Sequence, residues 1–297
     1  MKISVIGAGK WGSALFGALS RSNDCVLSSR RPREVEGFVP LEAALEAEHI
    51  VLSVATQHVR EFLEAHPLRE NQKILVASKG VEIATGKFLH EIFAEFAPLS
   101  NLSFLSGPSF ATEVARGLPC ALVVSGFNSN LNSVWADAFP PFIKAYVSED
   151  VVGSEVCGAY KNVVAIAGGV CEGLGLGANA RASLIARGLV EMHRFGKFFG
   201  AKDETFLGLS GAGDLFLTAN SEMSRNFRVG LGLAKGEKTS DILAALGEVA
   251  EGVPTAFAIK AKADENGIYA PIAREVCAMI DGKDVRETLK DLLKRNG

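Results

Sequence analysis

The chain has 297 residues, which is long for a single hydrophobic core and favours two domains. Its 31 Lys and Arg residues nearly balance 34 Asp and Glu residues, so the net charge of -3 gives no sequence-independent attraction to nucleic acid or to an anionic membrane. Its apolar runs are too short to cross a bilayer, and the first run lacks the pattern of a secretory signal. We therefore expect a cytoplasmic protein with a small, diffusible partner and no membrane insertion.

Residues 1–150 alternate short β-like apolar runs with segments of helical spacing. The β-like runs are residues 2–6, 25–29, 49–55, 73–78, 102–106, 120–126 and 144–148. Helical spacing is clear in residues 13–21, 58–66 and 87–96. This alternation is typical of βαβ units, so it predicts an α/β domain with a Rossmann-type, doubly wound, mostly parallel sheet.

After about Ser148 strand-like runs become rare, and helical spacing dominates to the end of the chain. The clearest helical segments are 184–199, 239–247 and 255–266. We therefore place a domain boundary near residue 150, with a sheet domain over 1–150 and an all-helical domain over 151–297.

The first β-like run leads into "GAGKWG", which places Gly7, Gly9 and Gly12 in the GxGxxG spacing before a helical segment. In that arrangement the first glycine permits a tight turn, the second lets a pyrophosphate approach the backbone, and the third lets helix and strand pack closely. The N–H groups at the helix start would hold the phosphates. A merely structural turn is the alternative, but the position between strand and helix favours dinucleotide binding.

The second run ends in "LSSRRP", which provides Arg30 and Arg31 and no acid. An acid at this position would bind the ribose hydroxyls of NAD, whereas arginine suits the 2'-phosphate of NADP. NADPH is therefore favoured over NADH. The alternative is that both arginines are ordinary solvated surface residues.

Two later loops also follow predicted strands. They contain Lys79 in "ASKGVE" and the stretch Gly107 to Ala111 in "LSGPSFATE". Ligands of open parallel sheets bind beyond the carboxyl ends of the strands, so these loops are candidates for a binding site. Lys79 by itself could equally be a surface lysine.

A series of longer motifs covers nearly the whole chain: "GAGKWGSAL", "ASKGVE", "LSGPSFATEVA", "YKNVVAIAGGVCEGLGLGANARASLIARGLVE", "LSGAGDLFLTANSEMSRNFRVG" and "VAEGVPTA". In this order they resemble bacterial NAD(P)-dependent glycerol-3-phosphate dehydrogenase. The resemblance implies interconversion of dihydroxyacetone phosphate and sn-glycerol 3-phosphate, with the latter used for phospholipid synthesis. It also implies a dinucleotide-binding first domain and a substrate-binding, catalytic second domain.

The resemblance further implies the roles of individual residues. The proton acceptor is Lys161, and the catalytic group also includes Lys79 and Asp214. The implied substrate-binding residues are Lys79, Gly107, Ser109, Lys161, Asn162, Asp214, Thr218, Ser224, Arg225 and Asn226. The implied cofactor-binding residues are Gly7, Gly9, Lys10, Trp11, Gly12, Arg30, Arg31, Lys79, Ala111, Arg225, Val249 and Glu251.

The chemistry gives independent reasons for two of these residues. Oxidising a secondary alcohol needs a base for the hydroxyl proton, and burial beside a second cation such as Lys79 would bring a lysine closer to that function, whereas Asp214 would act against it. Arg225 in "SEMSRN" offers a guanidinium to a phosphate at a predicted helix start. The alternatives are a lysine that reaches from a helix to water, and a capping Ser224 followed by an exposed Arg225.

The sequence departs from the family pattern at three places. The stretch from Arg31 to Leu41 is short, so a helix or strand near the adenosine end is expected to be missing. Ala55 replaces an expected proline, and Asn220 replaces a frequent cysteine. These departures bear on the cofactor-edge assignments more than on the chemistry.

The histidines and cysteines lack metal-ligand spacing, so no metal site is expected. The subunit number is open, with a homodimer as one expectation. Two further hypotheses remain: a two-domain dehydrogenase with a catalytic lysine that acts on a hydroxy acid, and a catalytically silent NADP(H)-binding sensor. The sensor would have no need of Lys161, Asp214, Arg225 and Asn226.

Overall fold

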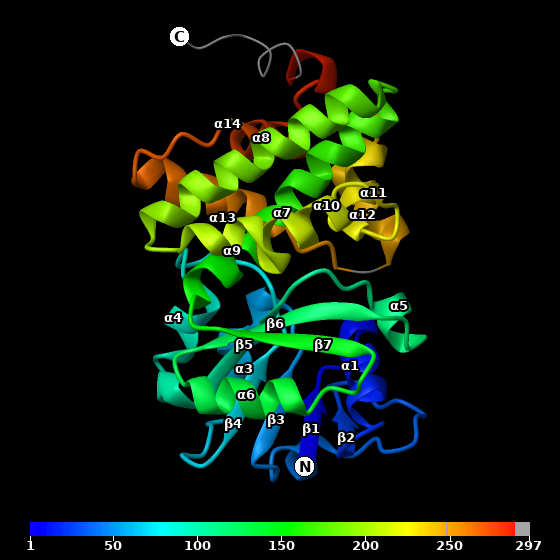
Figure 1. Cartoon of the computed structure of the whole chain (residues 1–297). Coiled ribbons are helices and arrows are strands. Elements are labelled where there is room, and N and C mark those ends of the chain that lie inside the picture. The colour runs from blue at the N-terminus through cyan, green and yellow to red at the C-terminus, as the bar shows by residue number, and fades with distance from the viewer. Residues whose placement is uncertain (248, 289–297) are drawn as a thin grey trace. The chain divides into compact units, whose positions relative to one another are not determined.

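The computed structural model describes residues 1–247 and 249–288. The chain forms two compact units. The first, here called the sheet unit, comprises residues 1–79 and 89–154. The second, here called the helical unit, comprises residues 80–88 and the chain from residue 155 onward. Figure 1 shows the elements of both units in chain order.

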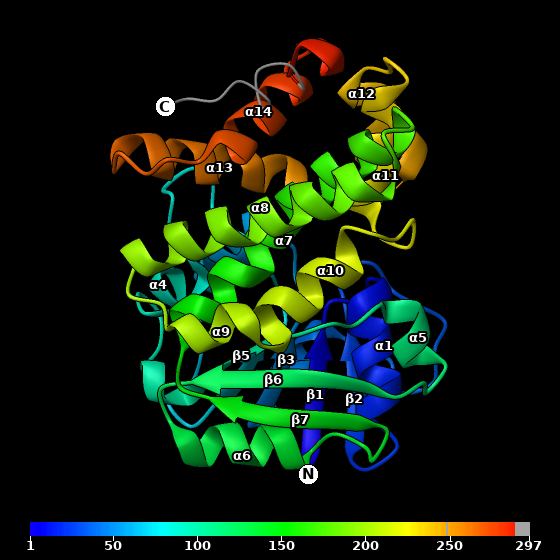
Figure 2. The ribbon, with the colours of Figure 1, turned by 45° about the horizontal axis from the view of Figure 1, so that its top comes forward.

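The sheet unit is built on one seven-stranded sheet with the order β2-β1-β3-β4-β5-β6-β7. The strands are β1 (Lys2–Ile6), β2 (Asp24–Ser28), β3 (His49–Leu52), β4 (Lys73–Val76), β5 (Leu102–Ser106), β6 (Cys120–Gly126) and β7 (Ile143–Ser148). Strands β1 to β5 are parallel, β6 is antiparallel to β5, and β7 is parallel to β6. Figure 2 shows β6 and β7 side by side. All seven predicted runs form strands, and the predicted mostly parallel sheet is confirmed.

Helices cover both faces of this sheet. Neighbouring residues of a strand point to opposite faces, so Val5 packs in one hydrophobic cluster and Ile6 in the other. The Val5 cluster includes side chains of α1 (Lys10–Leu19), α5 (Ala111–Ala115) and α6 (Ser129–Asp137). The Ile6 cluster includes side chains of α2 (Leu41–Ala44), α3 (Val59–Ala65) and α4 (Leu89–Phe93). Two apolar layers explain why the strands read as continuous hydrophobic runs.

The segment between β2 and α2 meets the sheet at one point. Leu27 forms an isolated parallel bridge with Phe38, and its N–H donates to the carbonyl oxygen of Gly37 at 2.9 Å. The N–H of Val39 donates in turn to the oxygen of Leu27 at 2.9 Å. All residues from 29 to 40 are described, and none of them belongs to a helix or strand. The short stretch after Arg31 therefore adds a single bridge to the edge of β2.

The helical unit contains most of the long α7 (Val151–Gly173), followed by α8 (Gly177–Phe198) and α9 (Asp203–Leu207). One turn of π-helix, η3 (Leu209–Gly213), leads directly into α10 (Asp214–Thr218). Further helices are α11 (Arg225–Ala234), α12 (Thr239–Leu246), α13 (Gly252–Glu265) and α14 (Pro271–Ile280), and residues 285–288 are helical as well. No strand follows β7 in the described residues, which agrees with the predicted helical second domain.

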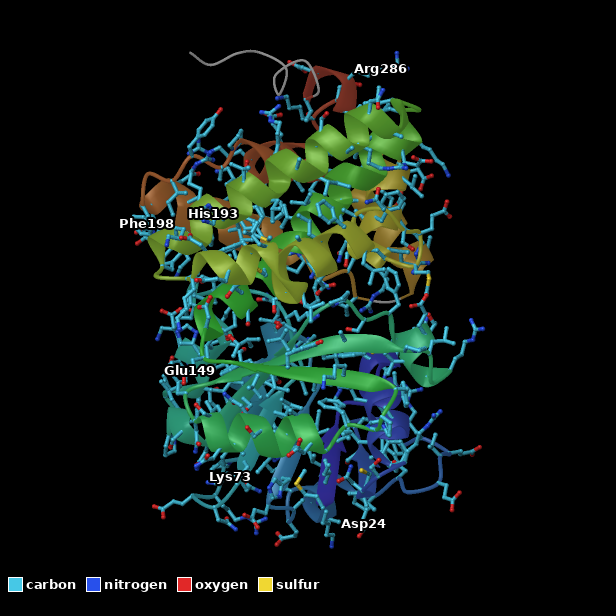
Figure 3. The ribbon with its side chains drawn as sticks, in the orientation of Figure 1. Asp24, Lys73, Glu149, His193, Phe198 and Arg286 are labelled. Atoms are coloured by element: carbon cyan, nitrogen blue, oxygen red, sulfur yellow. The ribbon has the colours of Figure 1, made fainter. Side chains whose placement is uncertain are left out.

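Glycines of α7 allow its neighbours to approach its backbone. A Cβ atom at Gly169 would overlap the carbonyl oxygen of Phe227 in α11, and one at Gly168 would lie 2.5 Å from the oxygen of Ala219, next to α10. On α8, a Cβ atom at Gly188 would lie 2.7 Å from Cγ1 of Val164. The "AGG" of α7 thus places α10 and α11 beside the segment that carries Lys161. On α8, His193, labelled in Figure 3, contacts α9: its Nε2 atom lies 2.7 Å from Oδ1 of Asp203.

Residues 80–88 pack with the helical unit although they directly follow Lys79 of the sheet unit. Val81 and Phe88 form an antiparallel bridge. Lys262 of α13 donates from Nζ to the carbonyl oxygen of Gly86 at 2.8 Å, and its ammonium lies 4.7 Å from the ring centre of Phe88. The sequence predicted one boundary near residue 150 and did not predict that residues 80–88 belong to the helical unit.

No described helix is both long and apolar enough to span a membrane.

Candidate active site

The glycine motif forms a tight turn between β1 and α1. Gly7 has φ +109°, and its N–H donates to the carbonyl oxygen of Ser28 at 2.8 Å, which ties the turn to the end of β2. A Cβ atom at Gly7 would overlap the carbonyl oxygen of Ser53, and one at Gly12 would overlap that of Gly7. A Cβ atom at Gly9 would meet nothing within 4 Å. Gly7 and Gly12 are thus required by the fold, whereas Gly9 leaves open space beside the backbone.

The start of α1 suits an anion. Its N-cap is Gly9, and no side chain caps the helix. The first-turn N–H groups therefore point past a residue that has no side chain, which is the geometry of helix N-termini that bind phosphate. This observation fits a dinucleotide pyrophosphate. Of the other residues expected here, Lys10 is exposed and Trp11 is half-buried.

Arg30 and Arg31 are both exposed directly after β2, next to the strand end that the glycine turn contacts. The hydroxyl of Ser29 donates to the carbonyl oxygen of Arg31 at 2.6 Å and shapes this corner. Within the described chain, the structure records no hydrogen bond or ion pair of either guanidinium group. The exposed position of both arginines after β2 is compatible with binding a ribose phosphate and equally with ordinary solvated surface residues.

The loops after β4 and β5 lie at the same carboxyl edge of the sheet as the glycine turn, because β1, β4 and β5 are parallel. Lys79 is half-buried three residues after β4. Gly107 has φ +103°, the hydroxyl of Ser109 donates to its carbonyl oxygen at 3.2 Å, and Ala111 begins α5. Asp24 and Lys73, labelled in Figure 3, begin β2 and β4 at the amino edge. The predicted residues of the sheet unit therefore gather at one edge.

The helical unit brings Lys161 and Asp214 together. Nζ of Lys161 donates to Oδ1 of Asp214 at 2.5 Å, and the two side chains are only 9% and 1% exposed. The hydroxyl of Thr218, one turn along α10, donates to the same oxygen at 3.2 Å. The π-helical turn before Asp214 aims this carboxylate, and its hallmark bond joins the N–H of Gly213 to the oxygen of Gly208 at 3.1 Å. A buried ammonium thus contacts a carboxylate that a second hydrogen bond holds in place.

Asn162 and Asn226 meet around the start of α13. Oδ1 of Asn226 accepts from the N–H of Gly252 at 2.9 Å, and a Cβ atom on Gly252 would lie 2.7 Å from that oxygen and 2.7 Å from the carbonyl oxygen of Asn162. Nδ2 of Asn162 donates to the carbonyl oxygen of Gly158 at 3.2 Å. These bonds leave the amide N–H groups of Asn226 and the amide oxygen of Asn162 for other partners. Sequence reasoning did not single out Gly252, whose lack of a side chain permits this contact.

Ser224 and Arg225 begin α11, as predicted. The hydroxyl oxygen of Ser224 accepts from the N–H of Phe227 at 3.3 Å, so Ser224 is the capping residue of the alternative interpretation. Arg225 is half-buried and not exposed, which departs from that alternative. It lies next to Asn226 at the amino end of the helix.

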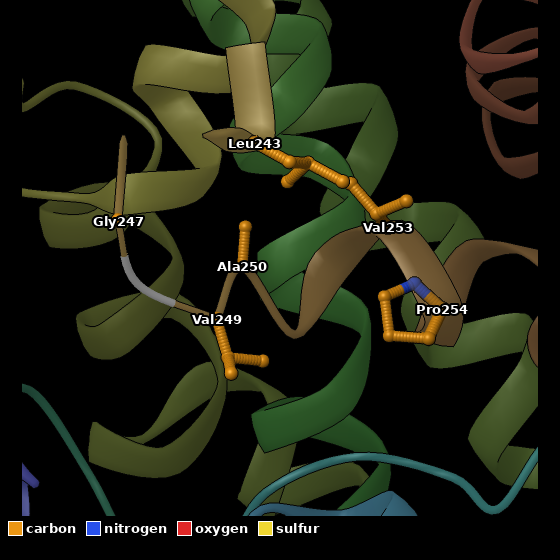
Figure 4. Close-up of a pocket in the computed structure, with 6 residues that line it drawn as sticks. All are labelled: Leu243, Gly247, Val249, Ala250, Val253 and Pro254. Carbon is orange, nitrogen blue, oxygen red and sulfur yellow. The ribbon is translucent and has the colours of Figure 1, made fainter. Parts of the chain in front are cut away.

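The last predicted cofactor residues flank the start of α13. Val249 is 56% exposed, and Glu251 is the half-buried N-cap residue of α13. Figure 4 shows Val249 in an apolar pocket between α12 and α13, lined by Leu243, Gly247, Val249, Ala250, Val253 and Pro254. Val249 thus presents an apolar side chain to solvent.

A doubly wound sheet with a pyrophosphate-fitting glycine turn, joined to a helical unit with a buried lysine–carboxylate pair, has the features of a two-domain nicotinamide-dinucleotide dehydrogenase. The N-terminal model of NAD-dependent glycerol-3-phosphate dehydrogenase matches residues 30–132, and the C-terminal model of the same family matches residues 150–290. The chain belongs to this family of oxidoreductases, so the resemblance stated from the sequence is confirmed.

Full-length relatives agree. The chain is 57% identical over 296 residues to glycerol-3-phosphate dehydrogenase [NAD(P)+] of Campylobacter jejuni (strain RM1221), with 100% of both chains covered. It is 56% identical over 292 residues to the enzyme of that name from Sulfurimonas denitrificans, covering 98% of this chain and 99% of the relative. The crystal structure of glycerol-3-phosphate dehydrogenase from Coxiella burnetii has a TM-score of 0.91 at 32% identity and covers 99% of each chain. D-mandelate dehydrogenase with NADH, at TM-score 0.67 and 13% identity, covering 96% of this chain and 99% of its own, shares the fold alone.

Proposed function

We propose that the chain reduces dihydroxyacetone phosphate to sn-glycerol 3-phosphate, and catalyses the reverse reaction, with Lys161 as the proton donor and acceptor. The observation that carries this proposal is the buried pair of Lys161 and Asp214 in a chain of this family. A bound nicotinamide would supply or accept the hydride at the substrate carbon. The protein must then provide the proton for the oxygen.

Lys161 suits that proton transfer in both directions. In reduction its ammonium gives a proton to the developing alkoxide oxygen and becomes a neutral amine, and in oxidation the amine takes the hydroxyl proton. Asp214 stabilises the ammonium form and holds Nζ in place, while Thr218 fixes the carboxylate oxygen that does so. Lys79 would add a second positive charge that stabilises the alkoxide.

Recognition of the substrate falls to two groups of residues. Arg225 binds the phosphate through its guanidinium, and Asn226 donates from the amide group that its bond to Gly252 leaves available. Ser224 contributes by starting α11, whose first N–H groups then face the anion. The amide oxygen of Asn162 accepts from a substrate hydroxyl. The further proposed substrate contacts are Lys79, Gly107 and Ser109.

For the cofactor, we propose that the turn at Gly9 holds the pyrophosphate and that Arg30 and Arg31 bind the 2'-phosphate of NADPH. The open space beside Gly9 and the exposed position of both arginines support this assignment. The remaining proposed cofactor contacts are Gly7, Lys10, Trp11, Gly12, Lys79, Ala111, Arg225, Val249 and Glu251. In the cell we propose a cytoplasmic enzyme whose product supplies the glycerol backbone of phospholipids.

The test contrasts the two basic residues on two substrates. Lys161→Ala should lower kcat by about 100-fold or more with a modest change in KM, because proton transfer is required only in the transition state. Arg225→Ala should raise KM for dihydroxyacetone phosphate strongly. On dihydroxyacetone, which lacks the phosphate, Arg225→Ala should be little worse than the wild type, because the partner group is already absent, whereas Lys161→Ala should remain impaired.

Lys235→Ala, which removes an exposed lysine at the end of α11, is the control and should behave as the wild type on both substrates. If Arg225→Ala impairs turnover of dihydroxyacetone as much as that of dihydroxyacetone phosphate, the phosphate assignment is wrong. If the wild type prefers hydroxy acids without phosphate, the substrate assignment itself is wrong.

A further inference from the structure

A second buried carboxylate lies in the helical unit, outside the chemistry described above. Glu191 of α8 is 2% exposed. Its Oε1 atom accepts from the hydroxyl of Tyr160 at 2.8 Å and from the N–H of Ala273 at 2.9 Å, and its Oε2 atom accepts from the N–H of Ile272 at 2.9 Å. Tyr160 is fully buried in α7 and immediately precedes Lys161.

These bonds join three helices at one carboxylate. The two N–H groups belong to the first turn of α14, whose own N-cap residue, Ala270, has no side-chain cap. A local Ser or Asp would cap that helix without the desolvation that a buried Glu suffers. The carboxylate of Glu191 instead satisfies α14 and the hydroxyl of Tyr160 together, so α7 is tied to α8 and α14 at the residue before Lys161.

This tie adds a directional restraint to the packing that surrounds α7. Around Lys161 that helix is buried on all sides, and Tyr160, Val163 and Val164 are each 0% exposed. A rotation of α7 by about 10° would move a group about 6 Å from its axis by about 1 Å. A displacement of ~1 Å at a reacting group can cost about 100-fold in rate.

We propose that Tyr160 and Glu191 are positioning residues for Lys161: their hydrogen bond fixes the rotation of α7 and so holds Nζ of Lys161 at the reacting oxygen. The inference rests on the proposed function of Lys161. Its own basis is the buried three-helix connection, which lies one residue from that lysine.

The state of the phenol supports this role. Burial, and after it the charge of Glu191, raises the pKa of Tyr160 well above its ordinary value of 10.0, so the hydroxyl keeps its proton and remains a donor. The ring of Phe195 packs against that of Tyr160 with 5.4 Å between the centres, which holds the phenol in place.

The central variant is Tyr160→Phe, which keeps the ring and removes only the hydroxyl. We expect kcat with dihydroxyacetone phosphate to fall by about 10-fold, with KM within about 2-fold of the wild type, because proton transfer suffers and substrate binding does not. Glu191→Gln can satisfy only part of the carboxylate's partners and should lower kcat in the same way. The double variant should be little worse than either single one, because both act through one bond.

The matched control is Thr239→Val. The hydroxyl of Thr239 donates to the carbonyl oxygen of Ile280 at 2.8 Å, so this variant removes one part-buried bond from the opposite end of α14. It should lower the melting temperature by an amount similar to Tyr160→Phe while leaving kcat unchanged. If Tyr160→Phe also leaves kcat unchanged, its role is structural and the inference is wrong.

Combining Tyr160→Phe with Lys161→Ala separates this inference from the proposed function. If Tyr160 acts by positioning the amine, adding Tyr160→Phe to Lys161→Ala should change the residual rate by less than about 2-fold. A full 10-fold loss in that background would overturn the inference while leaving the proposed function intact. A wild-type kcat in Lys161→Ala itself would refute both.

Discussion

At the scale of single residues, the roles proposed for the basic side chains follow from how deeply each is buried. Lys161 is buried against one carboxylate, a setting that suits proton transfer, whereas Arg30 and Arg31 are exposed after β2. An exposed guanidinium keeps its charge and offers a planar fork of donors, which suits a phosphate group. In the proposed mechanism, burial thus distinguishes the lysine that transfers the proton from the two arginines that bind the cofactor phosphate.

The exposed pair yields a prediction on cofactor preference. The wild type should have a higher kcat/KM for NADPH than for NADH. Arg30→Ala or Arg31→Ala should reduce this difference in kcat/KM, mainly by raising KM for NADPH. Arg33→Ala, in the same exposed segment, serves as the control and should leave the ratio unchanged. Steady-state kinetics with both cofactors checks this, and equal efficiency of the wild type with both would contradict it.

At the scale of elements, the β1–α1 turn shows how one motif combines fold and function. Gly7 and Gly12 admit no side chain because backbone oxygens occupy the space, so both serve the fold. Gly9 has φ -71° and ψ 175°, a conformation open to any residue, and nothing lies within 4 Å of its missing Cβ. The fold therefore tolerates a side chain at Gly9, whereas the pyrophosphate that we propose to bind there would not.

Gly9→Ala should consequently leave the fold intact and weaken binding of the cofactor. We expect the free energy of unfolding to fall by at most about 1 kcal/mol, the scale of an N-cap change, whereas the Kd for NADPH should rise more than about 10-fold. Gly17→Ala, in the open middle of α1, should stabilise by about 0.5–1 kcal/mol without affecting NADPH binding. An unchanged Kd in Gly9→Ala would mean that the pyrophosphate does not approach this turn.

The elements were largely predictable from sequence because their signals are local. Buried parallel strands appear as short apolar runs, and "SEMSRN" indicates a helix start within a few residues. The grouping of residues 80–88 with the helical unit depends on Lys262, far along the chain, and was missed. Glu191 was missed for the same reason, since "LVEMHRF" looks like any helix with an outward acid until α14 and Tyr160 cover it.

At the scale of the whole molecule, the carboxyl groups of Glu191 and Asp264 make the free energy of unfolding depend on pH in opposite directions. Burial raises the pKa of Glu191 above its ordinary 4.5, although the N–H groups of Ile272 and Ala273, the hydroxyl of Tyr160 and the charge of Arg194 oppose this shift. For Asp264, the hydrogen bond from Lys260 lowers the pKa below its ordinary 3.8. Stability from Asp264 is present above its unfolded-state pKa and is lost as the pH falls through its folded-state pKa.

Glu191 has the opposite sign, which gives a testable pH dependence. The contribution of Glu191 to the free energy of unfolding is fully present below about pH 4.5. It declines as the pH rises through the raised folded-state pKa, because burial penalises the charged form. The difference in free energy of unfolding between wild type and Glu191→Gln should therefore shrink as the pH rises from about 4.5. Urea unfolding at a series of pH values measures it, and a constant difference would contradict the assignment.

Chemical rescue tests whether the amine of Lys161 transfers the proton. NADPH oxidation by Lys161→Ala is followed with dihydroxyacetone phosphate while ammonium or methylamine is added, with Arg225→Ala treated in parallel. We expect the small amine to restore a saturable part of the lost rate in Lys161→Ala and to have no effect on Arg225→Ala. If a folded, NADPH-binding Lys161→Ala gains no rate from either amine, or if Arg225→Ala gains as much, Lys161 is not the proton-transfer group.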